Sequence, residues 1–173
     1  MQRQKGFSLI ELLIVVAIIL IIAAIAIPNL LSSRMAANES SAVGSIQAIK
    51  SAEYAYFSVY PTVGYASNIG NLSGVGSPCV PSSAAACLLD TSLANATPGT
   101  GAKSGYVFLA TGISGGSTLN NAFVAAGSPV SMNQTGNRDF CSTDDGVLRS
   151  KLGAVGDSPV NALGLCYAFP VTQ

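Results

Sequence analysis

Histidine is absent from the 173-residue sequence, and charged residues make up only 9% of it. Soluble proteins typically carry about 25% charged residues. Without histidine the chain lacks the commonest general base and metal ligand, and no serine–histidine or cysteine–histidine pair can form. A phosphate-binding Gly-x-x-x-x-Gly-Lys motif is also missing. We therefore expect neither an enzyme nor a bound cofactor.

The carboxylates that gather late in the sequence lack the spacing of a calcium-binding loop. They do not follow the EF-hand pattern D-x-[DN]-x-[DN]-G, and the cysteines show no C-x-x-C spacing. We interpret the carboxylates as solvated turn residues, with a calcium site as the alternative, and expect no metal. They are Asp139, Asp144, Asp145 and Asp157.

Basic residues are too few for the concentrated positive stripe of a nucleic-acid-binding protein. Beyond residue 100 the sequence offers only Lys103, Arg138, Arg149 and Lys151. The last three could meet on neighbouring strands. Weak DNA binding is therefore kept as an alternative that nothing else in the sequence supports.

The sequence has one long apolar run, at residues 7–27, in which only Ser8 and Glu11 are polar. About 20 residues span a bilayer as a helix, and the preceding Arg3 and Lys5 should stay on the cytoplasmic side. A secretory signal has a shorter apolar core. A simple membrane anchor does not explain Glu11, because a charge at membrane depth costs roughly 2.5–3.5 kcal/mol.

Residues 5–31, KGFSLIELLIVVAIILIIAAIAIPNLL, resemble the signature of type IV prepilins. The resemblance implies a leader at residues 1–6, cleavage between Gly6 and Phe7 by a prepilin peptidase, and N-methylation of Phe7. The family's acidic residue at the fifth mature position matches Glu11, and its helix-breaking proline matches Pro28. The signature covers only the first part of the chain and does not separate pilins from secretion pseudopilins.

Cleavage would leave Glu11 about one helical turn from a new amine on Phe7. Inside an apolar bundle Glu11 can pair with the amine of a neighbouring subunit, where losing one partner costs ~3–5 kcal/mol. Such a pair would set the axial register of assembly; the alternative places Glu11 in the lipid headgroup region. Pro28 removes a helix hydrogen bond, so we expect a kink or local unwinding there and stretching near it on assembly.

An amphipathic pattern continues the helix beyond the apolar run, to a stop at Pro61. We expect one helix over about residues 7–60, and Lys50 and Glu53 are expected to pair on its polar face. Residues 7–34 would be its membrane and filament-core half and residues 35–60 its amphipathic half. The apolar positions at helical spacing are Ala42, Ile46, Ile49, Tyr56 and Tyr60.

Residues 61–173 are expected to form a globular head of the pilin fold, an α+β class in which the long helix packs on a four-stranded antiparallel sheet. A loop over residues 61–104 would lie on the sheet, with a short helix within residues 84–93. Alternating strand and turn signals predict the meander over residues 105–152. Its strands are expected at residues 105–112, 121–130, 138–143 and 147–152.

Four cysteines lie beyond the apolar run, which predicts two disulfides in an oxidising compartment. Three pairings are open, and proximity favours Cys79–Cys87 and Cys141–Cys166. The second pair would tie the tail, residues 153–173, to the third strand.

The resemblance implies a structural filament subunit, the major pilin of a type IVa pilus. Its partners would be further copies of itself, the prepilin peptidase and the pilus assembly platform. It would reside in the bacterial inner membrane before assembly and in the extracellular pilus afterwards, supporting adhesion, surface motility or DNA uptake. The alternatives are a type II secretion pseudopilin in a short periplasmic filament, or a minor pilin. The long head and two disulfides favour a surface pilus.

Overall fold

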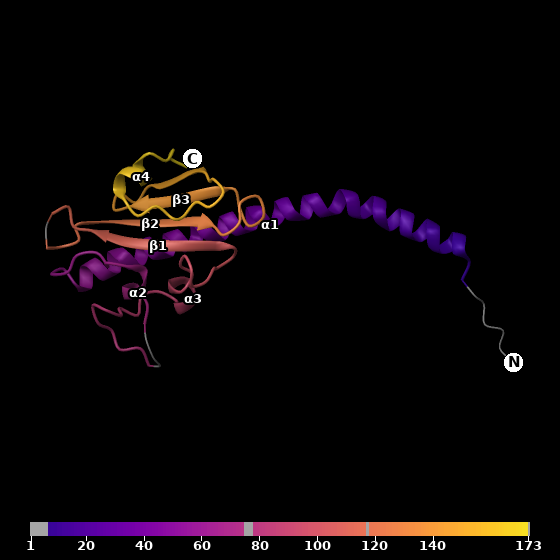
Figure 1. Ribbon diagram of the computed structural model, residues 1–173. Coiled ribbons are helices and arrows are strands. Elements are labelled where there is room, and N and C mark those ends of the chain that lie inside the picture. Colours follow the sequence, from indigo (N-terminus) through magenta and orange to yellow (C-terminus); the bar gives the residue numbers. More distant parts are fainter. Residues whose placement is uncertain (1–6, 75–77, 117, 173) are drawn as a thin grey trace. The chain divides into compact units, whose positions relative to one another are not determined.

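The computed structural model describes residues 7–74, 78–116 and 118–172. Its longest element is helix α1, Leu9–Val59, which confirms the expected helix to within two residues at each end. The chain divides into two compact units, the first ending at Arg34 and the second beginning at Met35. Helix α1 contributes to both units, and the second unit also holds the sheet (Figure 1).

The sheet is an antiparallel meander whose strands lie side by side in chain order. Each observed strand begins and ends within one or two residues of an expected one. A hairpin turn joins the third and fourth strands, and Gly146 in it has a φ of +74° that glycine adopts without strain. The strands are β1 (Tyr106–Ile113), β2 (Ala122–Pro129), β3 (Arg138–Thr143) and β4 (Leu148–Leu152).

One face of the sheet packs against the part of α1 that belongs to the second unit. Gly127 leaves room on this face for the ring of Phe108, its cross-strand partner, since a Cβ atom at Gly127 would lie 2.9 Å from that ring. Each large side chain buried in this core contributes roughly 1.5–3 kcal/mol. The core includes Ala42, Ile46, Ile49 and Tyr56 from α1 and Tyr106, Phe108, Phe123 and Phe140 from the strands.

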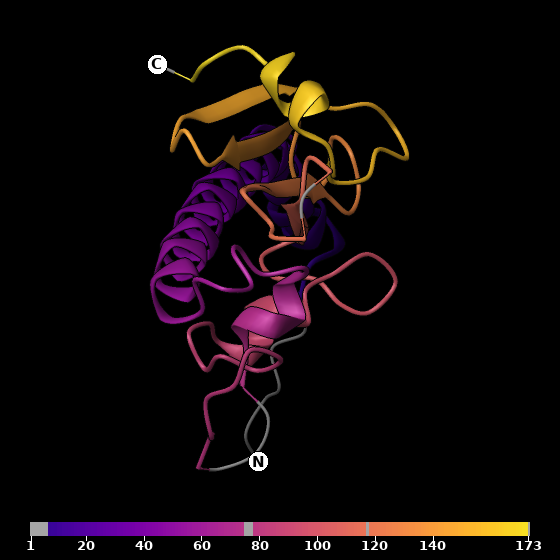
Figure 2. The ribbon, with the colours of Figure 1, turned by 90° about the vertical axis from the view of Figure 1, so that its left-hand side faces the viewer.

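The C-terminal segment, with helix α4 (Leu163–Tyr167), covers the opposite face of the sheet (Figure 2). The disulfide Cys141–Cys166 packs there with Val124, Ala126 and Phe169, and both cysteines are fully buried. The second disulfide, Cys79–Cys87, closes a short loop. Both pairings that proximity favoured are therefore present.

Other segments cover parts of both sheet edges. At the outer edge of β1, the Phe108 N–H donates to the Ala96 carbonyl at 2.6 Å. At the outer edge of β4, the Ser150 N–H donates to the Pro170 carbonyl at 2.9 Å. The loop before β1 and the C-terminal tail thus each take up hydrogen-bonding groups that an edge strand would leave free.

The short helix expected within residues 84–93 is wrong in extent, because α3 spans Thr91–Ala94. Before α3 the backbone is bonded to another segment: the N–H groups of Ala86 and Leu88 donate to the Asn71 and Leu72 carbonyls, both at 2.8 Å. Donors used in this way cannot close a helical turn. A further helix that the sequence did not predict, α2, spans Ile69–Leu72.

We expect the two disulfides to differ in their contribution to stability. Replacing Cys141 and Cys166 by alanine should lower the free energy of unfolding by ~3 kcal/mol, because that bond closes a separation of 25 residues. Replacing Cys79 and Cys87, 8 residues apart, should cost about 1 kcal/mol less. Denaturant unfolding of the full chain in detergent measures both changes. Equal losses, or a larger loss for the shorter loop, would contradict the expected order.

Candidate functional site

Every large apolar side chain from Phe7 to Leu31 is exposed, each by at least 42%. In the part of the chain that the structure describes, α1 is the one helix long and apolar enough to cross a membrane. The most apolar 18 residues of α1 have a mean hydropathy of 3.3, and none of them is buried. A surface this apolar is typical of a segment that contacts lipid or another protein.

Glu11 is the single charged residue between Phe7 and Ser33, and it lies in the first turn of α1. Its N–H donates to the Ser8 carbonyl at 3.1 Å, and its side chain is exposed. The helix dipole favours a carboxylate at this end by ~0.3–1 kcal/mol. The surface therefore presents one anionic group within an otherwise apolar stretch.

The expected cleavage site lies next to this turn. Gly6 falls outside the described residues, and Phe7, which is 79% exposed, directly precedes the first turn. Cleavage after Gly6, methylation of Phe7 and the pairing of Glu11 with a neighbouring amine stay predictions.

Helix α1 continues without interruption through Pro28. Pro28 has no N–H, so one backbone bond of the helix is missing. Polar side chains beside it bond to carbonyls one turn earlier: Asn29 Nδ2 donates to the Ile25 carbonyl at 3.1 Å, and Ser32 Oγ to the Pro28 carbonyl at 3.2 Å. The kink at Pro28 and the stretching of this segment on assembly stay predictions.

Glu53 is a buried ionisable residue that the sequence interpretation placed wrongly. Lys50 does not pair with it but donates from Nζ to the Gly146 carbonyl at 3.1 Å. Glu53 is fully buried, and its Oε2 accepts the Ala66 N–H at 2.8 Å. Burial raises the pKa of Glu53 to about 8, although the bond from Ala66 lowers it. Glu53 thus fastens the start of the loop to α1 as a neutral acid at pH 7.

A signal for this burial was present in the sequence. Position 53 lies four residues after Ile49 and three before Tyr56, so the apolar spacing of the helix passes through it. Position 53 also lies three residues after Lys50, which is equally compatible with an exposed ion pair. The tertiary contact with Ala66 decides between the buried and the exposed position of Glu53.

The late carboxylates are not four equivalent solvated turn residues. Asp144 is exposed, as expected, but Asp139 is buried, so that interpretation is wrong for Asp139. Asp145 forms an ion pair with Arg149, and this contact lowers the pKa of Asp145 to about 2. Among the described residues, no three His, Cys, Asp or Glu side chains gather where they could hold a metal ion.

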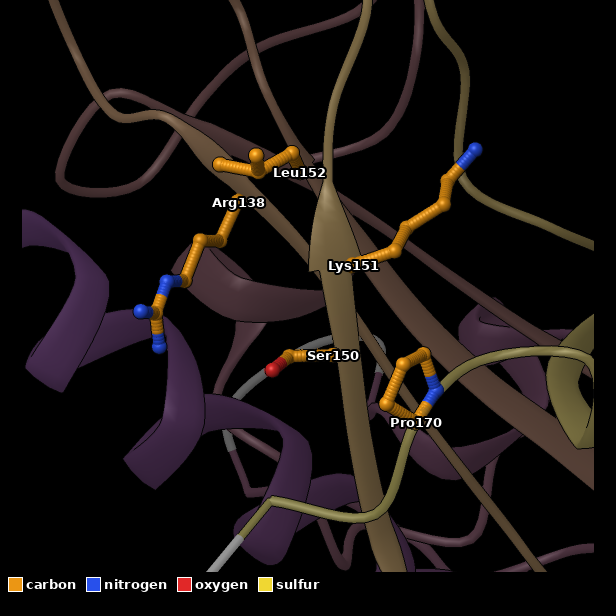
Figure 3. Close-up of a pocket in the computed structure, with 5 residues that line it drawn as sticks. All are labelled: Arg138, Ser150, Lys151, Leu152 and Pro170. Carbon is orange, nitrogen blue, oxygen red and sulfur yellow. The ribbon is translucent and has the colours of Figure 1, made fainter.

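Arg138 on β3 does not converge with the basic side chains of β4, Arg149 and Lys151. Figure 3 shows Arg138 and Lys151 leaving the sheet in opposite directions. Arg149 and Lys151 are each ion-paired with a carboxylate. The arrangement therefore offers no joint positive surface to a row of phosphates. Arg138 and Lys151 instead line an open hollow of about 360 Å³ together with Ser150, Leu152 and Pro170.

Comparison with known proteins finds a family model that matches the amino terminus and several relatives that match part of the chain. Residues 1–27 match the family model described as the prokaryotic N-terminal methylation motif. The chain is 62% identical over 40 residues to the Type IV wide pilus major component of Thermus thermophilus, covering 23% of this chain and 30% of that protein. It is 48% identical over 56 residues to the Type IV major pilin protein of Myxococcus xanthus, covering 32% and 26%.

A third relative comes from a secretion system. The Type II secretion system core protein G of Vibrio cholerae is 42% identical over 65 residues, covering 36% of this chain and 44% of that protein. The chain thus spans between about a quarter and less than half of the length of these curated relatives. No solved structure matches it significantly.

The buried acid makes the stability of the protein depend on pH. Between the ordinary Glu pKa of 4.5 and about 8, only the unfolded chain ionises at Glu53, so the free energy of unfolding falls as pH rises. Glu53→Gln removes this penalty while keeping an oxygen acceptor for Ala66. We expect the free energy of unfolding of the variant, relative to that of the wild type, to rise by roughly 1.4 kcal/mol for each pH unit across this range.

Chemical denaturation of the full chain at pH 4.5, 6 and 8 measures this gain. Glu39→Gln is the matched control, because Glu39 is a half-buried glutamate on the same helix that also accepts a backbone N–H, from Asn137 at 2.8 Å. A stability difference between Glu53→Gln and wild type that does not change with pH would show that Glu53 is ionised in the fold.

Proposed function

We propose that this chain is the major subunit of a type IV pilus. The match of residues 1–27 to the N-terminal methylation motif and the similarity to two type IV pilus subunits support the proposal. The observation that carries the proposal is the apolar stretch of α1 before Arg34, exposed throughout and interrupted by the single carboxylate of Glu11. The proposed role is structural, and it involves no catalysed reaction.

In the proposed sequence of events, a prepilin peptidase removes the leader after Gly6 and methylates Phe7. Residues 7–34 then hold the subunit in the inner membrane until an assembly platform moves it into the filament core. Transfer exchanges one apolar environment for another, so helix packing and the Glu11 pairing decide whether assembly is favourable. An unpaired carboxylate inside the bundle would be costly, which makes the amine of a neighbouring Phe7 the fitting partner.

The head would face the medium outside the cell. Its two disulfides suit an oxidising compartment and support loops that carry little regular structure. Adhesion, surface motility or DNA uptake are the activities that such a pilus would support.

A secretion pseudopilin is the second candidate function, favoured by the similarity to a Type II secretion system core protein G. The match covers 36% of this chain. In this alternative the protein would form a short filament that stays within the periplasm.

Mass spectrometry of filaments sheared from the cell surface separates the two functions. For a major pilin, we expect this chain to dominate the sheared fraction, to begin at N-methylated Phe7 and to lack four hydrogens relative to the reduced form. A chain processed after Gly6 but confined to the envelope fraction would favour the pseudopilin. A chain that still begins at Met1 in all fractions would contradict the processing itself.

Substitution of Glu11 tests the assembly step alone. Glu11→Gln keeps the size of the side chain but leaves the neighbouring amine without a counter-charge, so we expect the yield of sheared filaments to fall at least ten-fold. Processing after Gly6, followed in the membrane fraction, should be unchanged. Glu39→Gln serves as the matched control and should assemble normally. Normal filament yield from Glu11→Gln would show that the carboxylate does not set the register.

A further inference from the structure

Two aspartates and one lysine meet on the face of the sheet opposite α1. Asp139 on β3 and Lys151 on β4 are direct cross-strand partners. Asp157, beyond the end of β4, accepts the Ala154 N–H at 2.9 Å. The Lys151 Nζ atom lies 3.3 Å from Asp157 Oδ2 and 3.6 Å from Asp139 Oδ2. The three side chains thus connect β3, β4 and the turn that follows β4.

The charges of this cluster do not balance if both aspartates are ionised. Lys151 supplies one positive charge, and it hydrogen-bonds to Asp157 rather than to Asp139. The Asp139 side chain is only 4% exposed, against 32% for Asp157. Within the described residues, its Oδ1 has no hydrogen-bond partner. An ionised Asp139 would therefore be a buried anion whose nearest cation is already engaged, which is a costly arrangement.

Among the described residues that act on Asp139, Lys151 is the only cation. The neighbour from β2 is Ser128, an uncharged residue whose hydroxyl lowers the pKa of Asp139, but by less than burial raises it. Arg138 follows the opposite face of the sheet (Figure 3), and Arg149 is engaged with Asp145. The C-terminal segment contributes the ring of Phe169, 5.0 Å from Lys151 Nζ. Tyr106, whose hydroxyl donates to the Arg138 carbonyl, also belongs to the other face.

The pKa values of the two aspartates move apart in the same sense. Burial raises the pKa of Asp139, the Ser128 hydroxyl lowers it, and the neighbouring Asp157 carboxyl raises it again, so that the pKa stays above its ordinary value. The Ala154 N–H lowers the pKa of Asp157, and the bond with Asp139 also lowers it. Two carboxyl groups that share one site typically divide in this way, with one keeping its proton.

We propose that Asp139 keeps a proton and shares it with Asp157, and that this pair, with Lys151, is a proton-dependent clamp holding the turn after β4 on the sheet. The neutral cluster contains one proton, one carboxylate and one ammonium group. The clamp holds residues 153–157. The next covalent attachment of the chain to the sheet is the disulfide at Cys166, nine residues after Asp157.

The clamp works in a limited pH window. Asp139 has a raised pKa, so its contribution to stability is lost as pH rises and a second, unpaired carboxylate forms. Asp157 has a lowered pKa, so its contribution is lost as pH falls and the ion pair with Lys151 disappears. The turn should therefore be held most firmly at intermediate pH and loosen on both sides.

Carbon-detected NMR of the aspartate carboxyl groups, on the full chain in detergent, tests the proton directly and needs no substitution. We expect Asp139 to titrate above the ordinary Asp value of about 3.9 and Asp157 below it. If Asp139 titrates at or below that value, both carboxylates are ionised and the proposal is wrong.

Hydrogen exchange of residues 153–157 tests the clamp, after correction for the intrinsic pH dependence of exchange. The reporters include the Gly153 N–H, which donates to the Asn137 carbonyl at 3.0 Å. At intermediate pH, Asp157→Asn should lower protection of this turn at least ten-fold. Asp139→Asn imitates the protonated state. In this variant we expect the turn to stay protected from exchange at intermediate pH and to remain protected when the pH rises.

The matched control is Asp145→Asn, which removes another ion-paired aspartate of the same unit and should leave exchange of the turn unchanged. Equal loss of protection in Asp139→Asn and Asp157→Asn at intermediate pH would overturn the shared-proton clamp, because it would show that the negative charge of Asp139 is required.

Discussion

An α-helix can meet two different surroundings along its length only because its backbone groups are bonded internally, and the whole protein depends on that property of α1. From Leu9 to Val59 the helix is continuous, even across Pro28. Its surface is then free to be almost wholly apolar from Leu9 to Ile27, where Glu11 is the one polar residue, and amphipathic from Met35 onward. In the second unit the amphipathic part supplies one wall of the main core, and the other described helices, α2 to α4, are too short to replace it.

Local sequence signals made the regular elements predictable. The course of α1 follows from an apolar run and a spacing of three to four residues, and the strands follow from segments bounded by turn signals, the first of them rich in aromatic and β-branched residues. The disulfide Cys141–Cys166 was predictable for a related reason, since the third strand and the tail could be brought together by simple chain proximity. Elements that are specified by a local sequence pattern are therefore found where they were predicted.

Polar positions were harder to predict, because their environment comes from segments distant in the chain. Glu53 is compatible with an exposed face or a buried one, and the Ala66 N–H decides in favour of burial. Asp139 resembles the turn residue Asp144 in sequence but is buried between Ser128 of β2 and Lys151 of β4. The loop before β1 has no period at all, and its course depends on backbone bonds such as that from Ala86 to Asn71. These are the positions where the head differs most from expectation.

The covered sheet edges have a consequence for crowding. Subunits joined through their helices would keep their heads at a very high local concentration, at which even weak contacts between identical surfaces become populated. Bare strand edges would then fuse adjacent heads into one continuous sheet. The Ala96 carbonyl at one edge and the Pro170 carbonyl at the other each occupy an edge N–H group that could otherwise pair with a neighbouring head. In the proposed filament, neighbouring heads would therefore remain separate folded bodies that could move apart under load without first breaking a shared sheet.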